Sequence, residues 1–171
     1  MKDVVWVILM IAVICAIVWF IKKSSKVEKH FDEMQLQLRA TGYAAAYATA
    51  VVGMGAFMLL YETGQIGFID PAVSLMAVLM ASVAVFAVYC IRHEAFFSIG
   101  DKGNYYMVLC AIVVVLNGLS AVSAIMGGKF LQDGRLSFSG GAANLLTGLT
   151  FLAVLIALLV KKLGRESEAD E

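Results

Sequence analysis

The chain has 171 residues, of which 61% are hydrophobic and 15% charged, with one proline and a formal net charge of zero. Soluble domains contain roughly 45–50% apolar and about 25% charged residues, so this composition excludes an ordinary soluble globular protein. The apolar residues form five uncharged runs, each about as long as the helix that crosses about 30 Å of hydrocarbon. They span residues 4–21, 43–61, 71–91, 105–126 and 142–160. Because they lack the polar alternation of barrel strands, we predict an all-α membrane protein with a five-helix transmembrane bundle.

The basic residues of the loops are distributed unevenly. If successive loops lie on opposite sides of the membrane, one side carries Lys22, Lys23, Lys26, Lys29, Arg39, Arg92, Lys102, Lys161, Lys162 and Arg165. The other side carries only Lys2, Lys129 and Arg135. Short loops rich in lysine and arginine stay in the cytoplasm. We therefore predict that the N-terminus is outside and the C-terminus cytoplasmic, in a multi-pass protein of the plasma membrane.

The first apolar run, residues 4–21, is expected to be an uncleaved anchor, because its positive charges follow the run and no small-residue cleavage site is present. A charged segment, residues 22–42, comes next. Within it, Ser25 and Glu28 match a capping box. An apolar stripe at helical spacing then follows among basic residues: Val27, Phe31, Met34 and Leu38, with Lys26, Lys29 and Arg39.

This pattern predicts a short cytoplasmic amphipathic helix over residues 26–41, which contacts membrane lipid or a protein partner. The alternative is that the helix packs under the bundle. Gly42 is the expected bend into the second span.

Small and amide side chains predict close helix packing. Ala45, Thr49 and Gly53 stack at four-residue spacing in a span crowded with alanine and glycine, which places this span at the centre of the predicted bundle. Asn117 in the fourth span and Asn144 and Gly148 in the fifth are expected to lie at helix contacts, with the amides as interhelical hydrogen-bond partners. The functional alternative is a narrow polar path or a ligand pocket.

Two further features concern organisation. Residues 63–75 align without gaps with residues 133–145, sharing one Gly, Phe, Ala and Leu, which raises the possibility that spans two–three and four–five are a parallel duplication. In the first of these pieces, Asp70 before Pro71 is a strong helix-start signal. The acidic tail, residues 164–171, is expected to be disordered.

The spans contain no Asp, Glu, Lys, Arg or His. Proton relays and charge-coupled pumps depend on such groups within the membrane, so an ion-coupled transporter is disfavoured. The only histidines, His30 and His93, lie in loops of the predicted inner side, and no serine has a histidine or carboxylate at its own depth. Cys15, Cys90 and Cys110 fall within spans, where they are most simply apolar fillers. We predict no enzymatic activity, no cofactor and no nucleic-acid partner.

Methionine spacing suggests one metal site. Met54 and Met58 on the second span, and Met76 and Met80 on the third, are expected at similar depth, and four thioethers suit monovalent copper. The alternative, which we favour, is that these methionines fill irregular helix contacts.

Three short stretches resemble a family of proteins. They are residues 32–35 with Arg39, residues 86–91 followed by 94–97, and residues 144–146 before Lys161 and Lys162. Together they resemble a domain-of-unknown-function family of small, uncharacterised multi-span bacterial integral membrane proteins. The resemblance covers most of the chain from Asp32 onward and departs at residues 40–42, where a glycine and a basic residue directly after Arg39 would be expected. It implies a helical membrane fold in the bacterial inner membrane and supplies no activity.

Two functions fit these observations. The first is a non-enzymatic regulatory or scaffolding protein that docks a partner or lipid through residues 22–42. The second is a permease for a small solute or a metal such as copper. It would act as a homo-oligomer, because five short helices without a charged lining form a poor pore alone.

Overall fold

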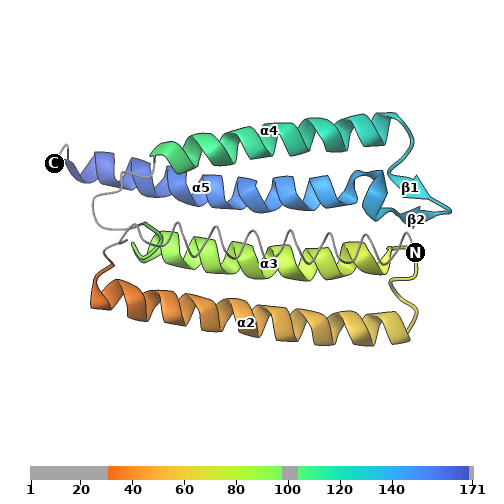
Figure 1. Cartoon of the computed structure of the whole chain (residues 1–171), viewed down its shortest axis with the longest axis horizontal. Coiled ribbons are helices and arrows are strands. Elements are labelled where there is room, and N and C mark those ends of the chain that lie inside the picture. Colours follow the sequence, from red (N-terminus) through yellow and green to blue (C-terminus); the bar gives the residue numbers. More distant parts are fainter. Residues whose placement is uncertain (1–30, 98–103, 170–171) are drawn as a thin grey trace, which may run out of the picture. The chain divides into compact units, whose positions relative to one another are not determined.

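The computed structural model describes residues 31–97 and 104–169. The chain divides into two units, and all the elements below belong to the second, Asp32–Glu171. Its long helices are α2 (Glu33–Glu62), α3 (Pro71–Arg92), α4 (Asn104–Met126) and α5 (Ala143–Ala169). Consecutive helices run in opposite directions, and α2 packs along α3, α3 along α5, and α5 along α4 (Figure 1).

Each of these four helices is long and apolar enough to cross a membrane. Large apolar side chains are exposed along them, including Leu116, Leu119 and Val160, each more than 60% exposed. Water would disfavour so much contiguous apolar surface, whereas lipid tails accept it. The described part of the chain therefore has the helices of a multi-pass membrane protein. The fifth predicted span, residues 4–21, and the predicted capping box at Ser25 lie outside the described residues.

Local signals explain where the helices begin and end. Asp70 caps α3, because its Oδ1 accepts a hydrogen bond from the Ala72 amide at 2.9 Å, and Pro71 occupies the first helical position. α2 and α4 each end in a glycine with positive φ, Gly64 (71°) and Gly128 (65°). In both, the amide after the glycine bonds back to a carbonyl in the last turn, which is the Schellman arrangement.

The start of α2 differs from the prediction. The helix is continuous from Glu33, so residues 33–41 of the predicted amphipathic helix belong to α2, and the predicted bend at Gly42 is wrong. Gly42 is buried instead. A Cβ at this position would lie 3.0 Å from the Cys90 sulfur and 3.1 Å from Cδ1 of Tyr89. This glycine lets α2 approach α3 closely and does not turn the chain.

The placement of α2 at the centre of the bundle is also wrong for the described helices, in which α3 and α5 are the inner pair (Figure 1). Within the part of the chain that the structure describes, one face of α2 is covered, by α3. Ala45, Thr49 and Gly53 lie on that half-buried face against α3, while other small residues of α2 are exposed, among them Ala44, Ala48, Gly55 and Ala56. The many small residues of α2 predicted close packing with other helices. In the structure they are divided between the face that packs on α3 and an exposed face.

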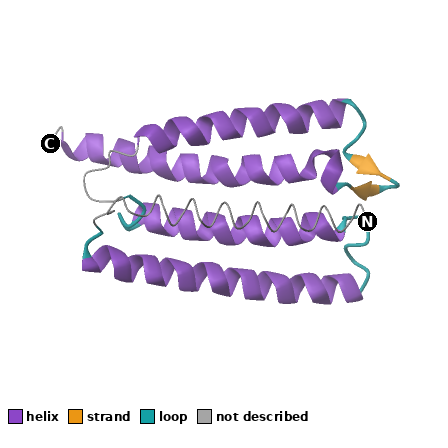
Figure 2. Cartoon of the chain, in the orientation of Figure 1, coloured by secondary structure: helices purple, strands orange, loops and turns teal. Residues whose placement is uncertain are grey.

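At the end of the bundle opposite Arg39, strands β1 (Leu131–Gln132) and β2 (Arg135–Leu136) form a short antiparallel hairpin (Figure 2). Asp133 and Gly134 both have positive φ, 51° and 73°, as a two-residue hairpin turn requires. β2 also bridges the loop before α3. The Asp70 amide donates to the Leu136 carbonyl at 3.1 Å, and the Leu136 amide donates to the Phe68 carbonyl at 2.8 Å. These bonds join the α2–α3 pair to the α4–α5 pair.

Between β2 and α5 the chain makes a π-helical turn, η1 (Phe138–Ala142). Two buried glycines make this turn possible. A Cβ on Gly140 would collide with the carbonyl oxygen of Lys129, and Gly141 has a φ of 108° and would meet the Ala124 Cβ at 2.6 Å. Only glycine combines this conformation with such close contacts.

The hairpin and η1 bear on the proposed duplication. The alignment of residues 63–75 with 133–145 pairs Gly64 with Gly134. Gly64 ends helix α2, whereas Gly134 lies in a β-hairpin, and the glycine that ends α4 is Gly128. That alignment therefore does not match structurally equivalent positions. At the far end of the chain α5 continues to Ala169, whereas the sequence predicts a disordered tail from residue 164.

Candidate functional site at the basic end of the bundle

We call the end where α2 and α4 begin and α3 and α5 end the basic end. It carries Arg39, Arg92, Lys161 and Lys162. The opposite end, which we call the hairpin end, carries Lys129 and Arg135. One cluster of buried apolar residues lies toward the basic end, where α3, α4 and α5 bring together Ala87, Ile91, Cys110, Val154 and Leu158. Polar side chains meet directly beyond this core.

These side chains converge on the turn that follows α3, residues 93–97, which we call the α3 exit turn. The Ala95 amide bonds to the Cys90 carbonyl at 2.8 Å, and the Glu94 amide bonds to the Ile91 carbonyl at 3.3 Å. This is again a Schellman arrangement, but the residue with positive φ is Glu94 (60°) and not a glycine. Cys90 and Ala95 are completely buried, as the apolar contact of that arrangement requires.

Side chains from α2 and α5 hold the α3 exit turn in place. Gln35 Nε2 donates to the Glu94 carbonyl at 2.8 Å, while its Oε1 accepts from the Asp32 amide at 3.3 Å and so caps α2. Arg39 Nη1 donates to the carbonyls of Ala95 and Phe96 at 3.1 and 3.4 Å. The turn therefore receives hydrogen bonds from the first two turns of α2.

Lys161 of α5 completes this anchorage. Its Nζ donates to the Ile91 carbonyl at 2.9 Å and lies 3.3 Å from Oε1 of Glu94. The lysine side chain is 18% exposed and the glutamate 61%, so the pair is partly shielded from solvent. Cations near a helix C-terminus interact favourably with its unpaired carbonyls. The Lys161 ammonium group thus donates a hydrogen bond to a carbonyl in the last turn of α3 and also pairs with the carboxylate of Glu94, which follows the helix.

The ion pair explains how a glutamate occupies a position that favours glycine, and it leads to a prediction. Glu94→Ala keeps the unfavourable φ and loses the pair, so we expect the free energy of unfolding to fall by about 1 kcal/mol. Glu94→Gly loses the pair but relieves the backbone, so we expect a change close to zero. Unfolding by SDS titration in mixed micelles measures both. Equal losses in the two variants would show that the backbone of Glu94 is not strained.

Aromatic rings connect the α3 exit turn to α4. Phe97 and Tyr106 have ring centroids 5.1 Å apart, and Phe96 lies 5.0 Å from Phe97 in an edge-to-face arrangement. Such pairs contribute about 0.5–1.5 kcal/mol beyond their buried area. All four described long helices therefore contact this one turn, α3 through the chain itself and the others through side chains.

The start of α2 extends beyond the end of α3. Gly42 lies against Tyr89 and Gly53 against Val78, and this antiparallel register places Arg39 level with Arg92. Glu33 lies six residues earlier, about 9 Å further along the helix axis at 1.5 Å per residue. We call residues 33–38 the α2 overhang. Its Met34 and Leu36 side chains are 67% and 53% exposed.

The predicted partner-contact residues are therefore divided. Met34 is exposed on the α2 overhang, whereas Leu38 is half-buried and Arg39 donates to carbonyls of the α3 exit turn, so partner contact by Arg39 stays a prediction. Phe31 directly precedes the helix cap, and Lys26, Val27 and Lys29 lie outside the described residues. Gln35 and Lys161 were not singled out as site residues by the sequence. The polar third residue after a helix cap is the signal that could have identified Gln35.

The methionines are not arranged as one site. Met54 and Met76 lie at similar levels in the register of α2 and α3. Met58, however, is level with Val73, which is about 10 Å along the axis from Met80, and its side chain is 59% exposed. Four thioethers spread in this way do not surround one ion. In the described chain, His, Cys, Asp and Glu side chains likewise form no group of three that could hold a metal.

The predicted packing residues lie between helices. Gly148 approaches α4, where a Cβ would lie 3.5 Å from the Asn117 Cβ. Asn144 donates to Ser120 Oγ across the α4–α5 contact at 2.7 Å, whereas Asn117 donates to the Val113 carbonyl of its own helix at 2.9 Å. A Cβ on Gly53 would touch Val78 at 3.0 Å. One of the two amides therefore makes an interhelical hydrogen bond.

The fold and this site define a class: a helical protein with several membrane-crossing segments, whose described helices are joined by polar contacts at one end. No protein-family model, no curated protein and no solved structure matches the chain. The resemblance to small multi-span bacterial membrane proteins thus stays a prediction. Of the residues quoted for it, Gln35 and Arg39 contact residues 94–96, and Lys161 contacts Ile91 and Glu94, whereas residues 144–146 lie at the hairpin end of α5.

Proposed function

We propose that the chain is a non-enzymatic docking protein of a bacterial inner membrane, which holds a protein partner on its α2 overhang. The observation that carries this proposal is a helix end fixed to the bundle, with an exposed apolar side chain on each flank of its anchored face. Gln35 and Arg39 fix it to the α3 exit turn, and Met34 and Leu36 are exposed. A helix held in this way loses little conformational freedom when a partner binds.

The distribution of basic residues supports a cytoplasmic location for the basic end, and with it the α2 overhang. Arg39, Arg92, Lys161 and Lys162 lie at the basic end, and the positive-inside rule places such an end in the cytoplasm. α2 is 30 residues long, about 45 Å at 1.5 Å per residue, and so exceeds a hydrocarbon core of about 30 Å. The overhang then lies beyond the hydrocarbon on the cytoplasmic side.

Charge also favours a protein partner over the lipid surface. Asp32 and Glu33 lie beside Met34 and Leu36, and both carboxylates would be repelled by anionic headgroups. A protein surface that contacts Met34 and Leu36 on the two flanks of this helix end and carries basic residues near Asp32 and Glu33 would fit it. Among the described residues of the predicted docking segment, Met34 and Leu36 are the exposed large apolar side chains.

A photo-crosslinker tests the proposal in native membranes. With benzoylphenylalanine at Met34, we expect one predominant protein adduct. Leu36→Asp should reduce its yield about tenfold or more, because it places a charge in an apolar contact. Met126→Asp is the control, since Met126, like Leu36, is an exposed apolar residue near a helix end but lies at the hairpin end. Adducts with lipid alone, or a yield that Leu36→Asp leaves unchanged, would contradict the proposal.

A further inference from the structure

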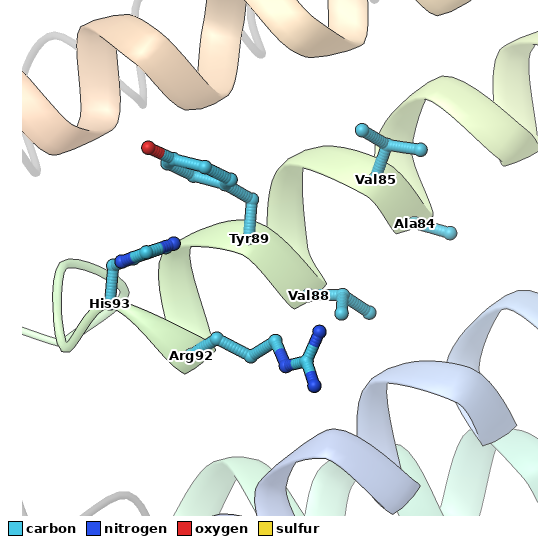
Figure 3. Close-up of a pocket in the computed structure, with 6 residues that line it drawn as sticks. All are labelled: Ala84, Val85, Val88, Tyr89, Arg92 and His93. Carbon is cyan, nitrogen blue, oxygen red and sulfur yellow. The ribbon is translucent and has the colours of Figure 1, made fainter.

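A second surface at the basic end differs from the α2 overhang. Five side chains of α3 and the first residue after it line an open groove of about 380 Å³ (Figure 3): Ala84, Val85, Val88, Tyr89, Arg92 and His93. The residues recur at helical spacing, so the groove follows the axis of α3 for about two turns. In Figure 3 it opens between α2 and α5.

Polarity changes in one direction along this groove. Ala84, Val85 and Val88 form its deeper part, toward the middle of α3, and present only methyl groups. Arg92 and His93 form the end at the last turn of α3, and both side chains are exposed. In Figure 3 the Arg92 guanidinium lies below Val88 on the side of α5, while Tyr89 and His93 lie on the side of α2. The Tyr89 and His93 rings contact each other at 4.4 Å between centroids.

We propose that this groove binds one anionic phospholipid. A fatty acyl chain lies along Ala84, Val85 and Val88, and the phosphate is held by Arg92 and His93. Arginine suits this task because its planar fork donates two parallel hydrogen bonds to a phosphate. Basic pockets between helices at the cytoplasmic surface recognise anionic headgroups on the same physical basis.

Local charge favours an anion. Glu94 is the acidic residue next to this end of the groove, and it is paired with Lys161 at 3.3 Å. Among the described residues that line the groove, Arg92 carries the permanent charge at its mouth. A phosphate group supplies the opposite charge at the level where α3 ends.

The other occupant to consider is the first apolar run of this chain, residues 4–21. That run ends in Lys22 and Lys23. An anionic lipid has the required polarity at both ends of the groove, and we therefore commit to it.

The test uses the full chain in vesicles of phosphatidylcholine containing one-fifth phosphatidylglycerol, with benzoylphenylalanine at Val88. After illumination, mass spectrometry identifies the adduct. We expect phosphatidylglycerol adducts to be enriched about fivefold over the share of this lipid in the vesicle, the effect of one basic group at a membrane surface. Arg92→Gln, and separately His93→Gln, should lower the enrichment. Arg135→Gln, an exposed arginine of the hairpin end, should leave it unchanged.

Two results would overturn the proposal. Labelling of the two lipids in proportion to their abundance would show an ordinary lipid-facing surface. A crosslink from Val88 to a peptide within residues 1–30 would show that the chain itself covers the groove. Arg92 and His93 are exposed, so neither replacement is expected to unfold the bundle, and a loss of enrichment then reports on lipid binding.

Discussion

Alanine in place of Gly140 is expected to lower the free energy of unfolding by about 3 kcal/mol. The added Cβ would collide with the main-chain carbonyl oxygen of Lys129, which cannot rotate away as a side chain would. Relief requires a shift of the turn before α5. The same turn is fixed by the hydrogen bond from the Ser137 amide to the Phe130 carbonyl at 3.0 Å and by the bond from the Gly140 amide to Ser137 Oγ at 3.2 Å. SDS titration in mixed micelles measures the loss.

Gly55→Ala is the matched control for this substitution. Gly55 is exposed in the middle of α2, and a Cβ there meets no atom within 4 Å. Alanine has the higher helix propensity, so we expect this variant to gain up to about 1 kcal/mol. If Gly140→Ala were as stable as Gly55→Ala, the close contact between η1 and Lys129 would not exist in the folded protein.

Helix positions that depend on neighbouring residues could be predicted from the sequence. Asp70 and Pro71 set the start of α3 at the predicted residue, because a cap and a fixed φ act locally. The apolar runs at residues 71–91 and 105–126 match α3 and α4 to within one residue at each end. In these cases the length of the run and the residues at its ends carry the information, and no distant contact is needed.

Gly42 shows why α2 could not be predicted in the same way. A glycine between a polar and an apolar segment fits a bend and a close helix contact equally well. The contact with Phe86, Tyr89 and Cys90 decides between them, and these residues are more than forty positions away. The same limit applies to the inner or outer position of α2, since small residues permit close approach on any face that carries them.

The polar contacts at the basic end were beyond sequence reasoning for a related reason. Arg39 lies where a helix is expected to leave the membrane, and a basic residue there is usually solvated. Its hydrogen-bond partner, the Ala95 carbonyl, is 56 positions away. That carbonyl needs a donor because the chain turns at Glu94 with positive φ, and no motif marks a glutamate for this conformation. The orientation of Arg39 thus follows from a turn that the sequence did not predict.

The α3 exit turn lies between the two proposed binding surfaces. On one side, Gln35 and Arg39 connect it to the α2 overhang. On the other side, Arg92 and His93 of the groove directly precede its Glu94. A change that loosens the turn is therefore expected to affect the overhang, whereas replacing Leu36 or Arg92 should affect only its own surface. The two proposals can fail independently.

Arg39→Met is the second substitution with a large expected effect. Methionine keeps an apolar stem of similar length but donates no hydrogen bond to the Ala95 and Phe96 carbonyls. A charged hydrogen bond at a half-buried position contributes about 1.5–3 kcal/mol, so we expect the free energy of unfolding to fall by about 2 kcal/mol. Arg135→Met, at an exposed arginine of the hairpin end, should change it by less than about 0.5 kcal/mol.

The same variant tests whether Arg39 anchors the α2 overhang. If it does, amide hydrogen exchange of residues 35–38 should become faster in Arg39→Met, because the first turns of α2 lose their bonds to the α3 exit turn and fray more often. Exchange in the middle of α2, near Thr49, should not change, since that part packs on α3 through small side chains. Faster exchange along the whole of α2 would mean that Arg39 holds the helix to the bundle and not only its end. Unchanged exchange at residues 35–38 would show that Gln35 alone is sufficient to fix the overhang.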